Sequence, residues 1–330
     1  MAKNRVDQSI CVYGAGILLK HRQALVQEIE GVRSGSQDIE YIHRMRVASR
    51  RLRSAFPLFE VCLPAKKSQA WLAQMKKVTR ALGAARDADV QIEALRAFST
   101  SQSDRLYRPG LMRLLLRLSQ HRNRLQAPLV KAMQDLQESK VLDHMLQHLS
   151  PLADLQDAVY LYTPALYQHS FKAITDRLNE LLNYDSIVFQ PEKKEELHAM
   201  RISAKWLRYT LENFNTIYSN NLKPQLQIVR KVQEMLGDIH DYDVWIDFLP
   251  VFLQEERQRT LDFFGNDRSF KRAIPGIQHF AEDRQALRDA RYLEFTGEWK
   301  RWQEEAVWDN LRQLIRAPAP TPPASETTSP

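Results

Sequence analysis

The chain has 330 residues, 44% of them hydrophobic and 26% charged, so it can build a core and is not disordered throughout. Its 47 Lys and Arg against 40 Asp and Glu leave a formal net charge of +7, which favours an anionic partner. Because only 10 residues are glycine, glycine-rich phosphate loops, dinucleotide-binding turns and hairpin-rich β folds are disfavoured.

Helical periodicity dominates the chain. The short apolar stretch at residues 10–19 lacks a small-residue cleavage site and indicates a first helix rather than a signal peptide. Residues 111–149, 163–182 and 222–252 carry Leu, Met, Val and Ile at intervals of three and four, which predicts amphipathic helices. No segment shows the sustained two-residue alternation of apolar and polar residues that would predict a β-strand. Residues 317–330, rich in Pro, Ser and Thr, predict a disordered tail.

The cysteines and the apolar runs indicate the cellular compartment in which we expect the protein. Two cysteines, Cys11 and Cys62, are too few for a disulfide framework or a four-thiolate metal site, and they are typical of a reducing compartment. No apolar run approaches the roughly 20 residues that span a bilayer. We therefore expect a cytoplasmic protein with no membrane partner.

An internal repeat is the most informative feature of the sequence. The block His43–Arg53 recurs as His198–Arg208, and the block Leu82–Val90 recurs as Leu236–Val244. The pairs Phe59 and Phe214, and Lys77 and Lys231, match at nearly the same offset. Two blocks in the same order at nearly the same offset indicate a duplicated unit of about 155 residues rather than chance similarity between helices.

Each copy of the first block predicts a helix with a cationic stripe. At about 100° per residue, four basic or histidine side chains fall within a sector of about 80°, opposite an apolar back. The first cationic stripe is His43, Arg46, Arg50 and Arg53, and the second is His198, Arg201, Lys205 and Arg208. Each stripe is a ladder about 15 Å long.

A solvated helix face is the alternative interpretation of these stripes. Such faces normally alternate Glu with Lys, because like charges three or four residues apart repel. Neither stripe contains an acid, and Arg, whose planar fork chelates phosphate oxygens, predominates over Lys. The stripes therefore favour an extended polyanion over one small phosphate.

The second block contains paired acids. His240 with Asp241 resembles the metal-binding pair of all-helical phosphohydrolases, but the matching residues in the first copy are Arg86 and Asp87. We expect one acid of each pair to orient a stripe arginine and the other to cap or pair locally, with purely structural roles as the alternative. These acids are Asp87, Asp89, Asp241 and Asp243. Neither His43 nor His198 has a metal ligand at suitable spacing on its own stripe, so we expect no metal site.

The two blocks in two copies resemble the CHAD family, the conserved histidine α-helical domain, from about Val12 to about Arg316. The resemblance implies an all-α fold of two helical bundles, related by a pseudo-twofold axis, around a basic central channel. It implies one domain over residues 1–316, made of repeats at about 8–150 and 160–316. It also implies that the protein binds inorganic polyphosphate without catalysis and without a cofactor. Polyphosphate granules are then the expected location.

The residues that the resemblance assigns to the ligand are the two stripes, with Lys77 and Lys231 from the following helix. Trp206 stands where the family often has a second basic residue, and His240 replaces the usual Arg, so the second half of the site is expected to carry less charge. A nucleic-acid backbone binder, such as an RNA binder, and a metal-dependent phosphohydrolase remain as alternatives. The oligomeric state stays open.

Overall fold

The computed structural model describes residues 6–34 and 40–316, and it is all-helical, as expected: no strand occurs within these ranges. The first half contains α1 (Gln8–Val26), α2 (Ile29–Arg33), α3 (Glu40–Leu58), η1 (Glu60–Cys62), α4 (Ala65–Ser101), α5 (Arg108–Arg124), α6 (Gln126–Glu138) and α7 (Val141–Ala153). The second contains α8 (Pro164–Leu182), η2 (Asp185–Ile187), α9 (Lys194–Phe214), α10 (Lys223–Phe264), α11 (Arg268–Lys271), α12 (Ile274–Glu304) and α13 (Val307–Ile315). The tail predicted over residues 317–330 lies outside the described residues.

Local sequence determines where these helices end. The helical segment predicted at 111–149 comprises three helices, with one break at Leu125 and a second at Lys140, whose φ is 51°. The segment predicted at 222–252 continues to Phe264, because the next residue with helix-ending geometry is Gly265, at φ 68°. Glycine adopts this left-handed conformation without a steric penalty and so ends α10 there.

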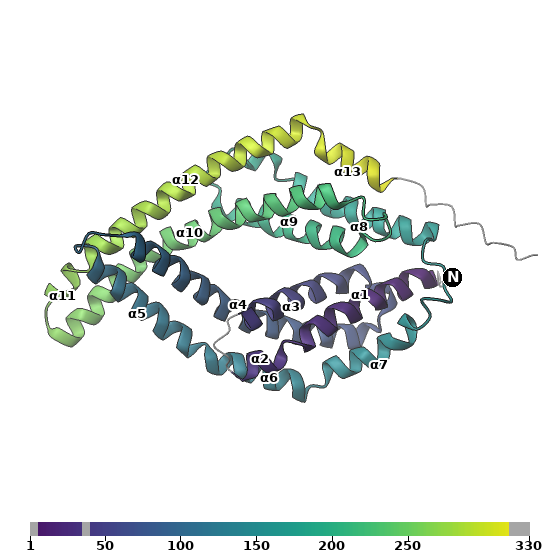
Figure 1. Ribbon diagram of the computed structural model, residues 1–330, viewed down its shortest axis with the longest axis horizontal. Coiled ribbons are helices and arrows are strands. Elements are labelled where there is room, and N and C mark those ends of the chain that lie inside the picture. Colours follow the sequence, from purple (N-terminus) through teal and green to yellow (C-terminus); the bar gives the residue numbers. More distant parts are fainter. Residues whose placement is uncertain (1–5, 35–39, 317–330) are drawn as a thin grey trace, which may run out of the picture.

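The two halves lie one above the other and share two hydrophobic cores (Figure 1). The larger core joins α1, α3, α6 and α7 to α8, α9 and α13, together with the first parts of α4 and α10 and the last part of α12. The distal core joins the ends of α4 and α10 to α5 and the start of α12. The residues between these two cores, on α3, α4, α9 and α10, therefore have fixed positions.

An aromatic cluster holds the halves together at the ends of α3 and α9. The rings of Phe59 and Phe214, which the repeat pairs with each other, are fully buried, with centroids 5.8 Å apart. Tyr13 of α1 stacks on Phe214 at 6.1 Å and donates a 2.6 Å hydrogen bond to the Asn213 carbonyl. A Cβ at Gly14 would lie 2.6 Å from Phe59, so only glycine lets α1 approach this closely.

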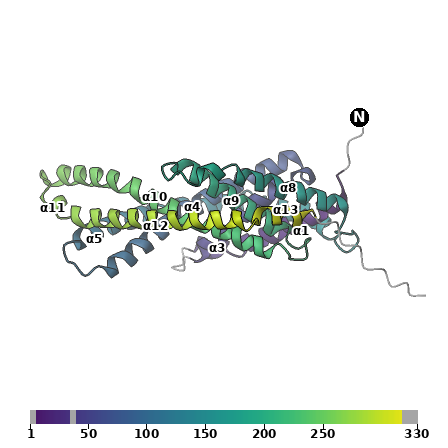
Figure 2. The same cartoon turned by 90° about the horizontal axis from the view of Figure 1, so that it is seen from above.

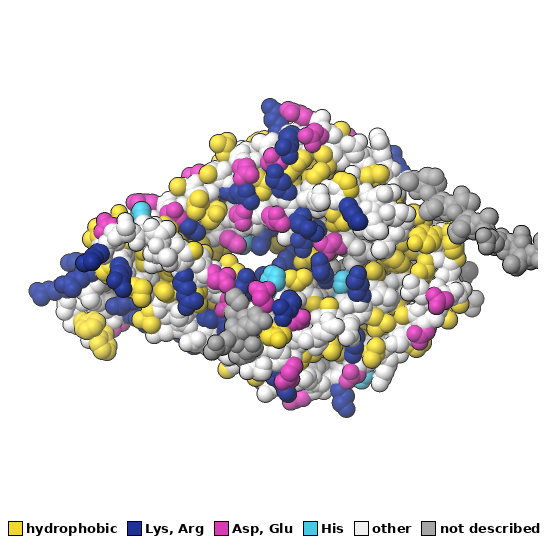
Figure 3. Space-filling model, in the orientation of Figure 1, with side chains coloured by type: hydrophobic (Ala, Val, Ile, Leu, Met, Phe, Trp, Pro, Cys, Tyr) yellow, Lys and Arg dark blue, Asp and Glu magenta, His cyan; other side chains and the backbone are white. Residues whose placement is uncertain are grey.

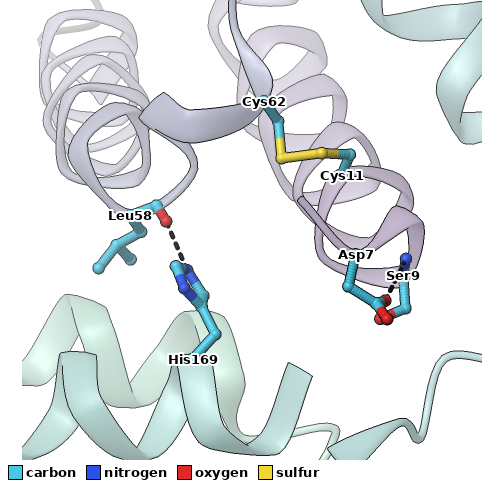
Figure 4. The surroundings of a disulfide bond; sticks show 6 residues. All are labelled: Asp7, Ser9, Cys11, Leu58, Cys62 and His169. Carbon is cyan, nitrogen blue, oxygen red and sulfur yellow. Dashed lines mark hydrogen bonds between the residues drawn. A yellow bond between two sulfur atoms is a disulfide. The ribbon is translucent and has the colours of Figure 1, made fainter. Parts of the chain in front are cut away.

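The cysteines contradict the sequence interpretation. Cys11 of α1 and Cys62 of η1 form a disulfide, with Cα atoms 5.3 Å apart, close to where His169 of α8 contacts the Leu58 carbonyl at 2.7 Å (Figure 4). Disulfides persist in oxidising environments, so the cysteines no longer support a reducing compartment. Among the described helices, none combines the length and the apolar character that crossing a membrane requires.

The disulfide should contribute measurably to stability. It closes a loop of 51 residues, which corresponds to about 4 kcal/mol of lost chain entropy in the unfolded state. Replacing both cysteines with serine should lower the free energy of unfolding by up to this amount in denaturant titrations. The wild-type chain in strong reductant should match the double variant. Equal stability of oxidised and reduced chains would show that the bond does not constrain the unfolded state.

Candidate polyanion site

Helices α3 and α9 lie side by side and run in the same direction across the junction of the halves. Their starts line one pocket, to which His43 and His198 both contribute, and their ends meet at Phe59 and Phe214. The Arg51 guanidinium of α3 lies 3.2 Å from the Glu212 carboxylate of α9 and links the helices at one flank. This arrangement places the two cationic stripes next to each other.

The electrostatics show that the stripes face one another. Burial, together with guanidinium groups from both helices, lowers the pKa of the Lys205 ammonium to about 7. These groups are Arg50, Arg201, Arg53 and Arg46. Burial also lowers the pKa of Arg50, and its neighbours Arg201 and Arg208 across the junction add to that effect. Cations from α3 and α9 thus share one partly buried space.

The matched arginines at the far end of the stripes have unused donors. The Nε atom of Arg53 is buried and has no hydrogen-bond partner. The buried Nε of Arg208 and Nη1 of Arg86 each lie 3.6 Å from a carboxylate, that of Glu212 and Glu93 respectively, which is an ion pair but not a hydrogen bond. Buried guanidinium nitrogens are normally hydrogen-bonded, so an anion that reached these atoms would supply the missing acceptors.

A pocket of about 450 Å³ opens at the starts of α3 and α9, where they meet α4 and α10. Its charged and imidazole lining is His43, Arg46, Arg86, Asp87, His198, Arg201, His240 and Asp241. Arg46 lies against Gly83 and Arg201 against Gly237, since a Cβ at either glycine would be 3.9 Å and 3.6 Å from the respective Nε. Each motif glycine therefore lies directly beside the stripe arginine of its own half, at a distance that a Cβ would also tolerate. In Figure 3, Lys and Arg side chains (dark blue) and His side chains (cyan) lie around the hollow at the centre of this face.

The paired acids have four different environments. Asp87 accepts a 3.1 Å hydrogen bond from Arg46, whereas Asp89 accepts a 2.7 Å bond from Arg122 of α5. Asp243, which is buried, pairs with Arg288 of α12 at 3.2 Å. Asp241 lines the pocket, where Arg201 is among the charges that act on it. One acid of each pair thus lies at the stripes, and the other holds α4 or α10 to a neighbouring helix.

His240, to which the sequence analysis gave no ligand role, belongs to this pocket. Its Nδ1 atom lies 3.1 Å from Nδ1 of His198, and the ring centroids are 4.0 Å apart. Burial, together with His198 and Arg201, lowers the pKa of His240 to about 4. Burial, Arg201 and Lys205 lower the pKa of His198. Both lowered pKa values favour neutral imidazoles at pH 7, so that one ring can donate its Nδ1–H to the other.

The two lysines assigned from the following helices lie apart from this arrangement. Lys231 of α10 forms a 2.7 Å ion pair with Glu298 of α12. Lys77 of α4 is exposed, and within the described residues it makes no hydrogen bond or ion pair with a stripe side chain. The structure therefore brings together the eight stripe residues but does not group these two lysines with them.

The CHAD domain model matches residues 16–250. The chain belongs to the CHAD family. This match spans both motif blocks in both copies, so the CHAD resemblance seen in the sequence is confirmed. The chain matches none of the curated proteins with which it was compared.

Two solved structures share the fold. A CHAD domain from the plant Ricinus communis is similar with a TM-score of 0.60 and 21% sequence identity, over 96% of this chain and 95% of that one. PptA from Streptomyces chartreusis is similar with a TM-score of 0.58 and 14% identity, over 87% of this chain and 98% of that one. At these identities the likeness shows the fold alone.

The CHAD site has the chemistry of a polyanion receptor. In residues 6–34 and 40–316, no three His, Cys, Asp or Glu side chains group closely enough to hold a metal ion. What the described side chains offer is a row of cationic donors from two helices, partly buried and opposed by few acids. Phosphate oxygens are the acceptors that guanidinium groups chelate best.

Proposed function

We propose that this CHAD protein binds inorganic polyphosphate without consuming it. The polymer would lie in a channel between α3 and α9 and contact both cationic stripes. In this proposal the halves are two duplicated bundles related by a pseudo-twofold axis, and each contributes one stripe. A protein of this kind would accumulate where the polymer does, at polyphosphate granules.

One observation carries the proposal: the cations of the two stripes crowd together although they repel. The depressed pKa of Lys205 indicates that this arrangement of cations is electrostatically unfavourable in the free protein. The buried Nε atoms of Arg53 and Arg208, at matching positions of the two stripes, make no hydrogen bond, although Arg208 lies 3.6 Å from Glu212. A linear polyanion relieves the repulsion and supplies acceptors to both stripes at once.

A single-stranded nucleic acid is the second candidate, because it also carries a phosphate backbone. Binders of single strands normally stack bases on aromatic side chains. Between His198 and Arg208, Trp206 is the one aromatic residue on which a base could stack. The Cζ atom of Arg177 already lies 5.4 Å from the centroid of its ring and covers it. This contact favours polyphosphate over RNA.

Calorimetric titration with long-chain polyphosphate, beside single-stranded RNA of matched charge, tests the proposal. We expect polyphosphate to bind at least tenfold more tightly than the RNA. A parallel incubation of protein and polymer with Mg²⁺ or Mn²⁺ should release no phosphate. Equal or tighter RNA binding would favour the nucleic-acid function, and turnover of even a few phosphates per minute would establish an enzyme.

Binding should weaken steeply with salt. Each cation that contacts the polymer displaces condensed counterions, with a logarithmic slope of about −0.7 per contact on single-stranded polyanions. If about six to ten cations engage, raising the salt from 50 to 200 mM should weaken binding by roughly two to four decades. A flat salt response in the same titration would mean that recognition does not depend on the stripes.

A further inference from the structure

Helix α11 lies at the end of the molecule opposite α13 (Figures 1 and 2). The adjoining end of α10 forms an exposed apolar tip. Phe263 and Phe264 close α10 just before the turn at Gly265. Their side chains are 82% and 56% exposed, and the rings touch edge to face with centroids 4.7 Å apart. Phe263 is the most exposed large hydrophobic side chain of the described residues. The distal core beneath contains Phe252 and Phe280 but does not include either ring.

Most of the acids around this tip are paired with cations. Asp267 pairs with Lys271 at 3.1 Å, and Glu255 pairs with Arg259 at 2.7 Å. Buried Glu256 is held by arginines of α5 and by Arg259. The carboxylate of Asp262 accepts a hydrogen bond from Gln258.

Four arginines at the same end have no carboxylate partner. Arg268 and Arg272 flank α11, directly after the phenylalanines. Arg105 lies just before α5, and Arg108 is its first residue. The start of α5 packs closely on the start of α12, as shown by the 2.0 Å that would separate a Cβ at Gly276 from the Tyr107 carbonyl oxygen. All four are exposed, and within the described residues no ion pair involves them. Against these four positive charges stands Asp262, whose hydrogen bond to an amide does not neutralise it, so the net uncompensated charge of the tip is positive.

We propose that this tip, formed by Phe263 and Phe264 with Arg105, Arg108, Arg268 and Arg272, docks on the surface of an anionic phospholipid bilayer. The two rings enter the boundary between headgroups and acyl chains, and the arginines contact the lipid phosphates. An exposed pair of rings beside cations fits a bilayer better than a second copy of this chain, because two copies of the tip would bring like charges together. The contact is peripheral and needs no spanning helix.

This inference is independent of polyphosphate binding, and the test keeps the two separate. Co-sedimentation is measured with vesicles of phosphatidylcholine containing 30% phosphatidylserine and with vesicles of phosphatidylcholine alone. We expect the full chain to bind the anionic vesicles and F263S/F264S to lose at least tenfold in binding. R268Q/R272Q should lose severalfold. L293S, which removes an equally exposed apolar side chain from α12, is the matched control and should bind like the wild type.

The stripes are also cationic, so their contribution must be removed. The R46A/R50A variant should retain vesicle binding, whereas loss of binding in this variant would place the lipid contact at the stripes and overturn the proposal. Equal binding of wild type and F263S/F264S would overturn it as well. If F263S/F264S instead abolishes self-association in sedimentation velocity while vesicles do not bind, the tip is an interface between copies. Thermal melting confirms that each variant is folded.

Discussion

Replacing Arg46 and Arg50 with alanine should weaken the binding of long-chain polyphosphate by about 10²–10⁴-fold. Each lost charge-assisted contact corresponds to about 1.5–3 kcal/mol, and about 1.4 kcal/mol is one decade of affinity. R201A/K205A should have an effect of the same size, because a chain bound between α3 and α9 contacts both stripes. Titration calorimetry with long chains measures both variants.

The fold should survive these changes. Among the described residues Arg50 has no carboxylate partner, and the partner of Arg46, Asp87, is 67% exposed and can be hydrated when the guanidinium is removed. K131A/K172A removes the same number of cations, but exposed ones on α6 and α8, and should leave affinity within about twofold. Short chains that reach one stripe should respond to one double variant only. If either double variant keeps full long-chain affinity while it melts normally, the shared channel is wrong.

Polyphosphate affinity should fall by roughly tenfold or more between pH 7 and pH 9. In the free protein the pKa of Lys205 is about 7, so above that pH the side chain is neutral. A bound polyanion favours the ammonium form and raises this pKa, so binding takes up a proton. Linkage then lowers affinity by up to tenfold per pH unit between the pKa of the free and the bound states. Calorimetry in buffers of different ionisation enthalpy measures the proton uptake directly.

The variant K205R keeps a fixed charge and should remove most of this dependence. The variant K205M should weaken binding and yet stabilise the free protein, raising its melting temperature by about 2–4 °C. The direction of this change in stability follows from the depressed pKa. Between pH 7 and 10.5 the unfolded chain binds more protons at Lys205 than the folded chain does, so folding must release a proton and Lys205 lowers the free energy of unfolding. A pH-independent affinity in the wild type would show that Lys205 does not contact the ligand.

Much of the site could be predicted because duplication marks it twice. The helical period placed the stripes on one face of each helix. The repeat also matched Phe59 to Phe214, but that these two residues meet in the core came only from the structure. The disulfide could not be predicted, since Cys11 and Cys62 are brought together by the packing of η1 on α1. His240 was given no role because its counterpart in the first copy is Arg86, and its contact with His198 joins helices that sequence alone does not align. The partner of Lys231, Glu298, lies on a helix outside both motif blocks.

Helix α10 is uninterrupted over 42 residues and carries both His240 of the pocket and Phe263 of the tip. These residues are 23 positions apart, which corresponds to as much as roughly 35 Å along the helix axis. A tip resting on lipid would therefore be separated from the pocket by the length of α10, which contains Pro250 between the two residues. The Debye length at physiological ionic strength is only about 8 Å, so the headgroup charges would be screened long before they reached the stripes. A polymer in the channel and a bilayer at the tip would not compete for the same cations.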